Sequence, residues 1–440
     1  MSAAEPPQGG SDVLLSDGGS AHLRPVRAED EARIAAFHRA LSLDTIRFRY
    51  FSGLAVLPKL ILRRFSHPDP ERECVLVAEV SGELIGLASY HRRGSEDSAE
   101  AAFVIADAHQ GRGLGTLLLE ALAQHARAHG VARFHADTLV GNRPMLRVFL
   151  DAGFPVEREA DGGVVHVRFP LEETPRVEAT REQREHLAEA RSVRRLIAPR
   201  SVLLAGGRVE GFRGVVHREL RDLPRDVDLA LFAGESRELD AFVSACGDAG
   251  VHALCVGALR AAPDREARAD FDRELCAEVR AHGMRLLGPE SLGVLNTGPD
   301  LALRTFELER LPGPGSLAIA SESPARGAAL LAGLAERHVG VSSFVSLGRR
   351  ADVSANDCLS YWLDDGATRS VALELASVGN PLKFARIAAR VARSKGLFAL
   401  ATGDPAQDAL LSSAGAQLAP SLDALLTLLR QRALPSTGSR

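Results

Sequence analysis

The fold is decided by a glycine-rich stretch, Gln110-Gly111-Arg112-Gly113-Leu114-Gly115, which separates an expected strand near 98–106 from a long amphipathic helix at 114–129. Glycines let the backbone curl tightly and turn its N–H groups inward. The N-terminus of the following helix adds a partial positive charge, so the stretch suits a pyrophosphate group. A Walker loop is disfavoured, because Gly115 is followed by Thr116 and Leu117 rather than by lysine.

The elements on either side of this loop predict an α+β domain with a mostly antiparallel sheet. A turn at Ser81-Gly82 joins two β-branched runs, 74–80 and 84–90, into a hairpin. Because a hairpin rather than a βαβ unit precedes the loop, a Rossmann fingerprint is disfavoured. The other expected elements are helices at 28–41, 55–66 and 143–151 and strands at 22–26, 133–139, 153–158 and 163–169.

From Ser201 onward the pattern changes to short apolar strands that alternate with helical stretches. This alternation favours parallel β/α units and a doubly wound sheet. The stretch Leu311-Pro312-Gly313-Pro314-Gly315 separates two such series. The expected strands are 202–205, 227–232, 253–256 and 285–287 in the first series and 316–320, 341–347, 370–375 and 397–401 in the second.

These patterns divide the chain into six segments. We expect a disordered tail at 1–20, the α+β domain at 21–172, a solvent-facing charged helical linker at 173–195, α/β domains at 196–312 and 313–434, and a tail at 435–440.

Composition narrows the function classes. The 440 residues carry 53 Lys+Arg against 57 Asp+Glu, a net charge of −4, which argues against a general binder of nucleic acid or membrane surfaces. Five cysteines without a CxxC pair favour a reducing cytoplasm and disfavour a zinc module, so we expect no metal. Only three lysines occur, Lys59, Lys383 and Lys395, which codon bias explains best.

Residues 21–170 resemble the GNAT acetyltransferase family, whose acyl-CoA loop has the form Q/R-x-x-G-x-G/A, matched here by Gln110, Gly113 and Gly115. The resemblance implies that loop amides hold the pyrophosphate of acetyl-CoA, the acyl donor, and that the preceding strand lies beside its pantetheine arm. The cofactor-binding residues that it implies are Phe103, Val104, Ile105, Gln110, Gly111, Arg112, Gly113, Leu114, Gly115, Thr116 and Asn142.

Within this family, Ala99–Val104 resembles the segment of bacterial protein acetyltransferases that carries a glutamate general base, here Glu100. A lysine amine, with a pKa of about 10.4, must lose a proton before it attacks a thioester. The alternative is that Glu100 only faces solvent at the start of a strand.

Asn142 resembles the asparagine that opens the next-to-last helix of the family and bonds the cofactor, although an ordinary helix N-cap explains it equally well. Many relatives place a tyrosine on that helix as general acid. Here we find Phe149 and no tyrosine, so the general acid is unassigned. We expect His109 and His135 to be surface histidines.

Residues 196–432 resemble the Rossmann-like CoA-binding and flavodoxin-like ligase-CoA domains of NDP-forming acyl-CoA synthetases, relatives of the succinyl-CoA ligase α subunit. The blocks that carry the resemblance are 343–357 with Tyr361-Trp362, Gly379-Asn380-Pro381 with Lys383-Phe384, and 288–294.

Several departures from that family predict that this half is not an active ligase. Those ligases act through a phosphohistidine, whereas no histidine follows His338 here and an ATP-grasp domain is missing. The remaining departures are Ala376 for a supporting glutamate, the turn Ser321-Glu322-Ser323-Pro324-Ala325, the turn Gly288-Pro289-Glu290 and the short loop Ala205-Gly206-Gly207. These changes leave retained CoA binding an open question.

Together these observations favour a cytoplasmic, acetyl-CoA-dependent Nε-lysine acetyltransferase of proteins, with acyl-CoA synthetases among its expected targets and a ligase-like regulatory or scaffold module. Neither nucleic acid nor a membrane is an expected partner. Two alternatives stay open: acetylation of a small-molecule amine, and a non-catalytic CoA-responsive binding protein. The sequence leaves the oligomeric state unknown.

Overall fold

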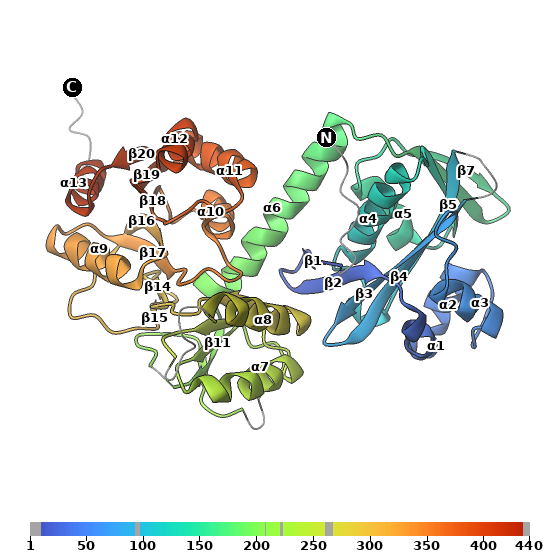
Figure 1. Cartoon of the computed structure of the whole chain (residues 1–440), viewed down its shortest axis with the longest axis horizontal. Helices are drawn as coiled ribbons and strands as arrows, with labels where there is room; N and C mark the ends of the chain where they lie inside the picture. The colour runs from blue at the N-terminus through green and yellow to red at the C-terminus, as the bar shows by residue number, and fades with distance from the viewer. Residues whose placement is uncertain (1–9, 93–96, 207, 221–222, 260–266, 434–440) are drawn as a thin grey trace. The chain divides into compact units, whose positions relative to one another are not determined.

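The structure, a computed structural model, describes residues 10–92, 97–206, 208–220, 223–259 and 267–433. The chain forms two compact units, residues 1–188 and 189–440, each with its own sheets and core (Figure 1). Residues 1–9, Gly207 and the expected tail at 435–440 lie outside the described residues. Within the described ranges, no helix has the length and apolar character needed to cross a membrane.

The first unit is built on an eight-stranded sheet with the order β1-β2-β3-β4-β5-β6-β8-β7, in which only β5 and β6 run parallel. The mostly antiparallel α+β architecture expected from the sequence is therefore confirmed. Its strands are β1 (Ser11–Leu14), β2 (Ser20–Pro25), β3 (Glu73–Val80), β4 (Glu83–Arg92), β5 (Ser98–Ile105), β6 (Arg133–Leu139), β7 (Glu157–Asp161) and β8 (Val164–Pro170).

Alternating side chains of β3 supply both faces of this sheet with apolar residues. Leu76 and Ala78 pack in the core that holds α4 and α5, whereas Val75 and Val77 pack in the core that holds α1, α2 and α3. A strand that alternates in this way must be covered on both sides. The helices are η1 (Ala28–Asp30), α1 (Glu31–Ala40), α2 (Leu43–Tyr50), α3 (Lys59–Ser66), η2 (Asp107–His109), α4 (Leu114–Ala128) and α5 (Arg143–Asp151).

The sequence analysis overlooked α2 and began the helix at 55–66 too early, because α3 starts at Lys59. Leu43, Ile46 and Tyr50 have helical spacing, but Phe48 adds an alternation with Ile46 and Tyr50, so the apolar pattern of this short segment is ambiguous. Only Ile46 of α2 is buried. Tertiary contacts rather than periodicity therefore define this helix.

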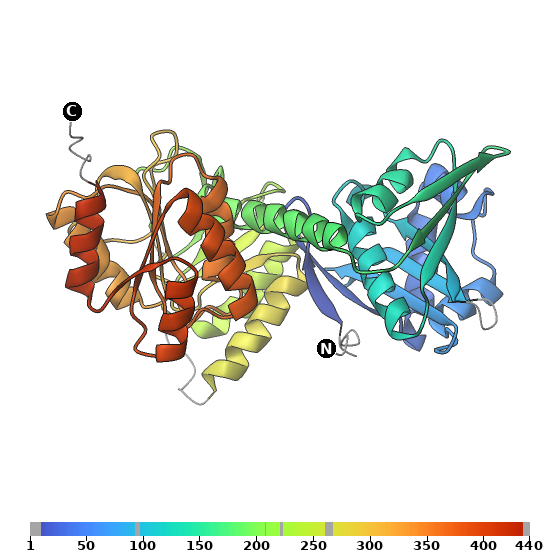
Figure 2. The same cartoon turned by 90° about the horizontal axis from the view of Figure 1, so that it is seen from above.

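The expectation of a disordered tail is wrong for residues 11–20, which form β1 and the turn into β2 (Figure 2). Leu15 in that turn is fully buried in the core below α4. Its backbone N–H also donates to the carbonyl of Gly19, at 2.8 Å. The Gly, Ser and Pro content of the segment concealed this single apolar anchor.

The carboxylate of Asp30 is held in a buried ion pair and makes the first unit sensitive to acid. Burial acts against its ionisation, but the Arg24 guanidinium donates to both of its oxygens, at 2.7 and 2.8 Å, and its pKa falls to about 2. A carboxyl group whose pKa is lower in the folded state than in the unfolded state stabilises the fold at pH values above its unfolded-state pKa. This contribution is lost as the pH falls through the folded-state pKa.

We therefore expect the first unit to lose about 2 kcal/mol of stability between about pH 4 and pH 2 through this one group. Hydrogen exchange of peptides from α1 and β3 measures the loss, and Asp30→Asn is expected to flatten the pH dependence. Asp161→Asn, which removes an exposed carboxylate of β7, serves as the control. An unchanged pH dependence in Asp30→Asn would contradict the assignment.

The charged region at 173–195 lies in the helix α6 (Pro175–Ile197), whose first half belongs to the first unit and whose second half belongs to the second. The expectation that it faces solvent is wrong in part, because Val177, Val193, Leu196 and Ile197 are fully buried. Apolar residues spaced along a highly charged helix are sufficient to bury one side of it at each end.

The second unit contains two α/β sheets with mostly parallel strands, as the sequence predicted. A five-stranded sheet has the order β10-β9-β11-β12-β13, and a seven-stranded sheet has the order β15-β14-β17-β16-β18-β19-β20. Their strands are β9 (Ser201–Ala205), β10 (Val215–His217), β11 (Leu229–Phe232), β12 (Ala253–Val256), β13 (Arg285–Leu287), β14 (Val294–Asn296), β15 (Leu303–Arg304), β16 (Pro314–Ser321), β17 (Val341–Ser346), β18 (Ser370–Glu374), β19 (Gly396–Leu400) and β20 (Gln417–Ala419).

Helices cover both faces of the seven-stranded sheet. Leu330 of α9 and Leu425 of α13 pack in one core, and Leu359 of α10, Phe384 of α11 and Leu411 of α12 pack in the other. The helices of the second unit are η3 (Ser236–Glu238), α7 (Leu239–Asp248), α8 (Arg268–Ala281), α9 (Pro324–Glu336), α10 (Ala355–Asp364), α11 (Pro381–Ser394), α12 (Pro405–Ser413) and α13 (Leu422–Ala433).

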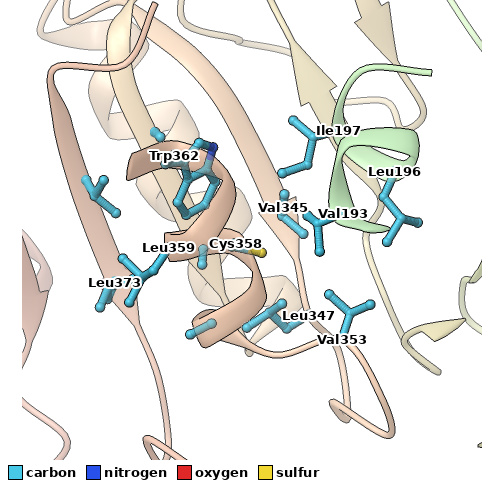
Figure 3. Close-up of a cluster of buried hydrophobic side chains, with 14 of the residues drawn as sticks. Val193, Leu196, Ile197, Val345, Leu347, Val353, Cys358, Leu359, Trp362 and Leu373 are labelled. Atoms are coloured by element: carbon cyan, nitrogen blue, oxygen red, sulfur yellow. The ribbon is translucent and has the colours of Figure 1, made fainter. Parts of the chain in front are cut away.

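The core of the second unit is continuous across both of its sheets. Trp362 of α10 is fully buried in this core, close to Leu359 and Cys358 of the same helix (Figure 3). Its indole nitrogen donates to the Ser343 hydroxyl, at 2.8 Å. Next to this apolar core, the buried Arg285 guanidinium pairs with Asp352 at 2.8 Å and with Asp357 at 3.1 Å. Arg285 joins the five-stranded sheet to the loop and helix of the seven-stranded domain, so the two sheets form one unit.

Candidate active site

The glycine-rich loop lies between η2 and α4 and has a backbone that only glycine adopts readily. Gly111 and Gly113 have φ angles of 75° and 77°, in the left-handed region. Gly113 is also the N-cap of α4, so no side chain caps the first amides of this 15-residue helix. Uncapped N–H groups at the positive end of a helix form a site for an anion.

The third glycine of the motif has a packing role. A Cβ atom on Gly115 would come within 2.9 Å of a methyl carbon of Val148 on α5. Its absence lets α5 lie directly against the first turn of α4. The loop and both helices therefore form one rigid side of the site.

A cavity of about 1070 Å³ opens in front of this loop, where β5 and β6 separate. The two strands pair in parallel only from Ser98 to Glu100. Residues 101–105 of β5 then continue alongside β4 alone and line the cavity opposite Asp137 and Thr138 of β6. The Ile105 carbonyl accepts a hydrogen bond from the Gln110 side chain, at 3.2 Å. A strand edge that has no neighbouring strand can receive an extended ligand in the manner of an added strand.

The cavity gathers nearly all of the site residues predicted from the sequence. Its lining includes Glu100, Phe103, Val104, Ile105, Gln110, Gly111, Gly113, Leu114, Gly115, Thr116 and Asn142. Arg112 is the exception, because its side chain turns away from the cavity toward β1 and β2. These residues therefore share one location, although their individual roles remain predictions.

The side chain of Arg112 joins the glycine loop to the turn between β1 and β2. Its guanidinium pairs with Asp17 at 2.7 Å and donates to Nδ1 of His109 at 2.8 Å. Its carbonyl accepts a hydrogen bond from the backbone N–H of Ser16, at 2.9 Å, and a Cβ on Gly113 would lie 3.3 Å from Ser16. The turn thus supports the loop from behind, which the sequence did not reveal.

We expect Asp17→Asn to raise the KM for acetyl-CoA about twofold to fivefold and to leave kcat almost unchanged, because a partly exposed ion pair contributes modestly. High salt should reduce the difference from the wild type. Asp12→Asn is the matched control, since Asp12 bonds His22 on the same hairpin instead of the loop. Equal effects of the two substitutions, or a change confined to kcat, would contradict this role.

Glu100 lies where β5 and β6 separate, because it belongs to the last pair of residues that joins the two strands. It is exposed, lines the cavity and lies across from His91 on β4 and His135 on β6. A second carboxylate, Asp137, also lines the cavity, but it accepts a hydrogen bond from His166 at 2.7 Å. Glu100 therefore has the position that a base facing the cavity requires.

Asn142 is the N-cap of α5, where its side-chain oxygen accepts from the N–H of Met145 at 3.2 Å. It also lines the cavity. Phe149 on the same helix is 1 % exposed and packs in the core, edge-on against the Phe103 ring and tilted against the Phe169 ring. Phe149, the aromatic residue found on this helix in place of a tyrosine, therefore faces the core rather than the cavity.

His109 lines the cavity, whereas His135 does not. Burial and the neighbouring Arg112 charge lower the pKa of His109. Its ring is accordingly neutral near pH 7.

The cavity wall supplied by α2 was missed by the sequence analysis. Ser42, the N-cap of α2, and Thr45 both donate to the carboxylate of Asp107, at 2.7–2.8 Å, and Gln110 donates to the Thr45 hydroxyl at 3.1 Å. Burial raises the pKa of Asp107, but these hydrogen bonds outweigh it and lower the pKa overall. They tie α2 to the glycine loop; the Ser42 N-cap before Leu43 was the available sequence signal.

The second unit offers no comparable site among the residues predicted from the ligase motifs. The carboxylate of Glu322, in the turn after β16, accepts from the N–H of Ala376 at 2.8 Å and pairs with Arg350 at 2.6 Å. Glu290 has a φ of 61° and pairs with Arg349 at 2.9 Å. Throughout the described ranges, no group of three or more His, Cys, Asp or Glu side chains could hold a metal ion.

Comparisons with known proteins match both halves of the chain. Residues 40–154 match the model of the acetyltransferase (GNAT) family, and residues 314–436 match that of the succinyl-CoA ligase-like flavodoxin domain. An acetyltransferase of Pseudomonas aeruginosa is 31% identical over 158 residues, which are 34% of this chain and 85% of that protein. The α subunit of an ADP-forming acetate–CoA ligase of Pyrococcus furiosus is 28% identical over 46% of this chain, which spans 44% of that subunit.

Two solved structures extend these matches. The GNAT domain of S. lividans PAT is 36% identical, with 38% of this chain and 99% of that domain covered and a TM-score of 0.36. A dinucleotide-forming acetyl-coenzyme A synthetase of Ca. Korarchaeum cryptofilum is 22% identical, with 55% and 62% covered and a TM-score of 0.50. The latter similarity concerns the fold alone.

Proposed function

The chain belongs to the GNAT acetyltransferase family, fused to an ADP-forming acyl-CoA synthetase-like domain, and we propose that it transfers acetyl groups from acetyl-CoA to lysine side chains of proteins. One observation supports this proposal. Glu100, the edge of β5 that no longer pairs with β6, and the left-handed glycines of the loop all line the same cavity. A donor-binding loop and a base thus face the same space.

The residues present suit acetyl-CoA. The uncapped amides of α4 and the Gly111–Gly113 backbone would receive the pyrophosphate, and residues 103–105 of β5 would bond the pantetheine arm. The bound donor supplies an activated acetyl thioester. A side chain at Gly113 would be crowded, because its Cβ would lie 3.3 Å from Ser16.

Glu100 would then act as general base. Its carboxylate takes a proton from the lysine ammonium, directly or through a water, so that the neutral amine can attack the acetyl carbon. A carbon–nitrogen bond forms, the carbon–sulfur bond breaks, and the nitrogen loses its second proton to water, while the thiolate of CoA takes up a proton from water as it is released. The ammonium group therefore transfers a proton to Glu100 before the acetyl group moves from the sulfur to the nitrogen.

The ligase-like unit, in this proposal, is a regulatory or scaffold module without ligase chemistry. No histidine follows His338, and only residues 401–404 connect β19 to α12, which leaves no long loop to carry a phosphohistidine. Glu322 already pairs with Arg350 at the carboxyl end of the sheet. Incubation with radiolabelled ATP should therefore leave no acid-labile phosphoryl label on this chain.

One assay tests the acetyltransferase proposal. The full chain, labelled acetyl-CoA and a purified acyl-CoA synthetase are incubated together, and labelled lysines are located by mass spectrometry. We expect label on the synthetase with the wild type and not with Glu100→Gln. Label on small amines alone would favour the small-molecule alternative, and binding of acetyl-CoA without turnover would favour a non-catalytic, CoA-responsive protein. A cytoplasmic location is part of the proposal, because cytoplasmic enzymes are its expected targets.

A further inference from the structure

The guanidinium of Arg49 lies in the cavity wall and has no ion-pair partner among the residues that the structure describes. Arg49 lies in the last turn of α2 and lines the cavity, yet within the described ranges no carboxylate pairs with it and no group accepts a hydrogen bond from it. Its Nε atom is buried and unsatisfied. Arg49 as a whole is half-buried, and burial lowers the pKa of its guanidinium.

A buried N–H group without an acceptor is costly to a fold, and in a native protein it calls for an explanation, of which a bound ligand is one. The surroundings of Arg49 hold the group in place but do not neutralise it. Its guanidinium lies 5.1 Å from the ring centre of Tyr50, and that ring contacts His38 edge-on. Stacking on an aromatic ring orients a guanidinium and leaves its N–H groups free to donate.

None of the five described carboxylates that line the cavity forms an ion pair with Arg49; they belong to Asp44, Glu100, Asp107, Asp137 and Asp151. Asp107 accepts from Ser42 and Thr45, and Asp137 accepts from His166. The carboxylate of Glu100 acts on Arg49 electrostatically, in the direction that raises the pKa of the guanidinium, and no ion pair joins the two side chains. Arg49 thus lies near the proposed base, on the side of the cavity formed by α2.

The position of Arg49 assigns it to the acceptor rather than to the donor. The donor cradle consists of the glycine loop and residues 103–105, whereas Arg49 projects from α2 near Glu100. A guanidinium fork matches a carboxylate in two parallel hydrogen bonds. A carboxylate near the reacting amine would therefore neutralise the charge of Arg49 and also accept a hydrogen bond from its buried Nε.

We propose that Arg49 binds a carboxylate that the acceptor carries close to its amine, which makes Arg49 a specificity residue of the acetyl transfer. This inference rests on the proposed acetyltransferase function. The carboxylate has two possible sources, an acidic side chain next to a lysine in a protein, or the α-carboxylate of a free amino acid. Both present the same chemistry to Arg49.

The test compares acceptors that differ only in this charge. A peptide with one lysine flanked by aspartates is compared with its asparagine counterpart, and free lysine with its blocked amide. The wild type is expected to have at least a tenfold higher kcat/KM for an acidic acceptor than for its neutral counterpart. In Arg49→Gln the preference should disappear, while the KM for acetyl-CoA stays within twofold of the wild type.

Arg47→Gln is the matched control, because Arg47 lies two residues earlier on α2, is exposed and does not line the cavity. Arg49→Lys should recover part of the preference, and thermal unfolding shows whether each variant folds. A preference for aspartate peptides supports the inference with a protein acceptor, and a preference confined to free lysine supports it with an amino acid. Folded Arg49→Gln that retains the wild-type preference would overturn it.

The outcomes separate the inference from the function on which it rests. Acetylation of charged and neutral acceptors with equal kcat/KM would overturn the role of Arg49 and leave the acetyltransferase proposal standing. Absence of transfer to all peptides, free lysine and an added synthetase would overturn both.

Discussion

Replacement of Glu100 by glutamine is expected to lower kcat for acetyl transfer by about 10²–10⁴-fold, the range over which a positioned general base contributes. Glutamine keeps the size of the side chain but cannot accept the proton of the attacking amine. Because Glu100 lies at the parting of β5 and β6, away from the glycine loop, the KM for acetyl-CoA should stay close to that of the wild type. Steady-state kinetics with varied acetyl-CoA measure both constants.

Asp137→Asn is the matched control for this prediction. Asp137 is the other carboxylate that could face an acceptor from the neighbouring strand, but it already accepts a hydrogen bond from His166. We expect it to lower kcat far less than Glu100→Gln. A larger loss in Asp137→Asn would transfer the role of base to β6 and contradict the assignment made here.

Replacement of Gly113 by alanine is expected to raise the KM for acetyl-CoA at least about tenfold, which corresponds to about 1.4 kcal/mol. An L-residue at a φ of 77° costs about 1–2 kcal/mol, and the new Cβ would meet Ser16 at 3.3 Å. The loop would relieve this strain by moving, and its amides would then lose their common direction. Titration of acetyl-CoA in the transfer assay measures the effect.

Gly130→Ala separates backbone strain from donor binding. Gly130 follows α4, has the same φ of 77° and has open space around its Cβ position. The substitution should lower the thermal stability of the first unit by a similar amount but leave the KM for acetyl-CoA unchanged. If both variants raised the KM equally, the role of Gly113 in the donor cradle would be wrong.

The local sequence was sufficient to predict the structure wherever the conformation of a segment depends on that segment alone. The spacing of Gly111 and Gly113 predicted the loop because left-handed backbone is a property of the residue itself. Strand β6 and helix α5 were predicted with their observed limits, since their apolar periods are regular and their ends carry turn or capping residues. The same holds for the alternating β/α pattern of the second unit.

The local sequence was not sufficient to predict features that depend on contacts between segments distant in sequence. Leu15 is one apolar residue in a Gly- and Ser-rich stretch, and its burial depends on α4. Arg112 was expected to face the donor, but Asp17, 95 residues away in sequence, turns its side chain outward. The helix α2 has too weak a period to be recognised, and its place depends on hydrogen bonds to Asp107.

The sequence by itself therefore determined the family, the order of elements, the glycine cradle and the position of Glu100 in the chain, because these follow from local backbone preference and recognisable motifs. Only the tertiary structure decided that β5 and β6 part after Glu100, that the first hairpin supports the loop, and that the Arg49 Nε has no hydrogen-bond partner among the described residues. The physical reason is that burial and pairing of charge are properties of the packed molecule, and no single segment contains them.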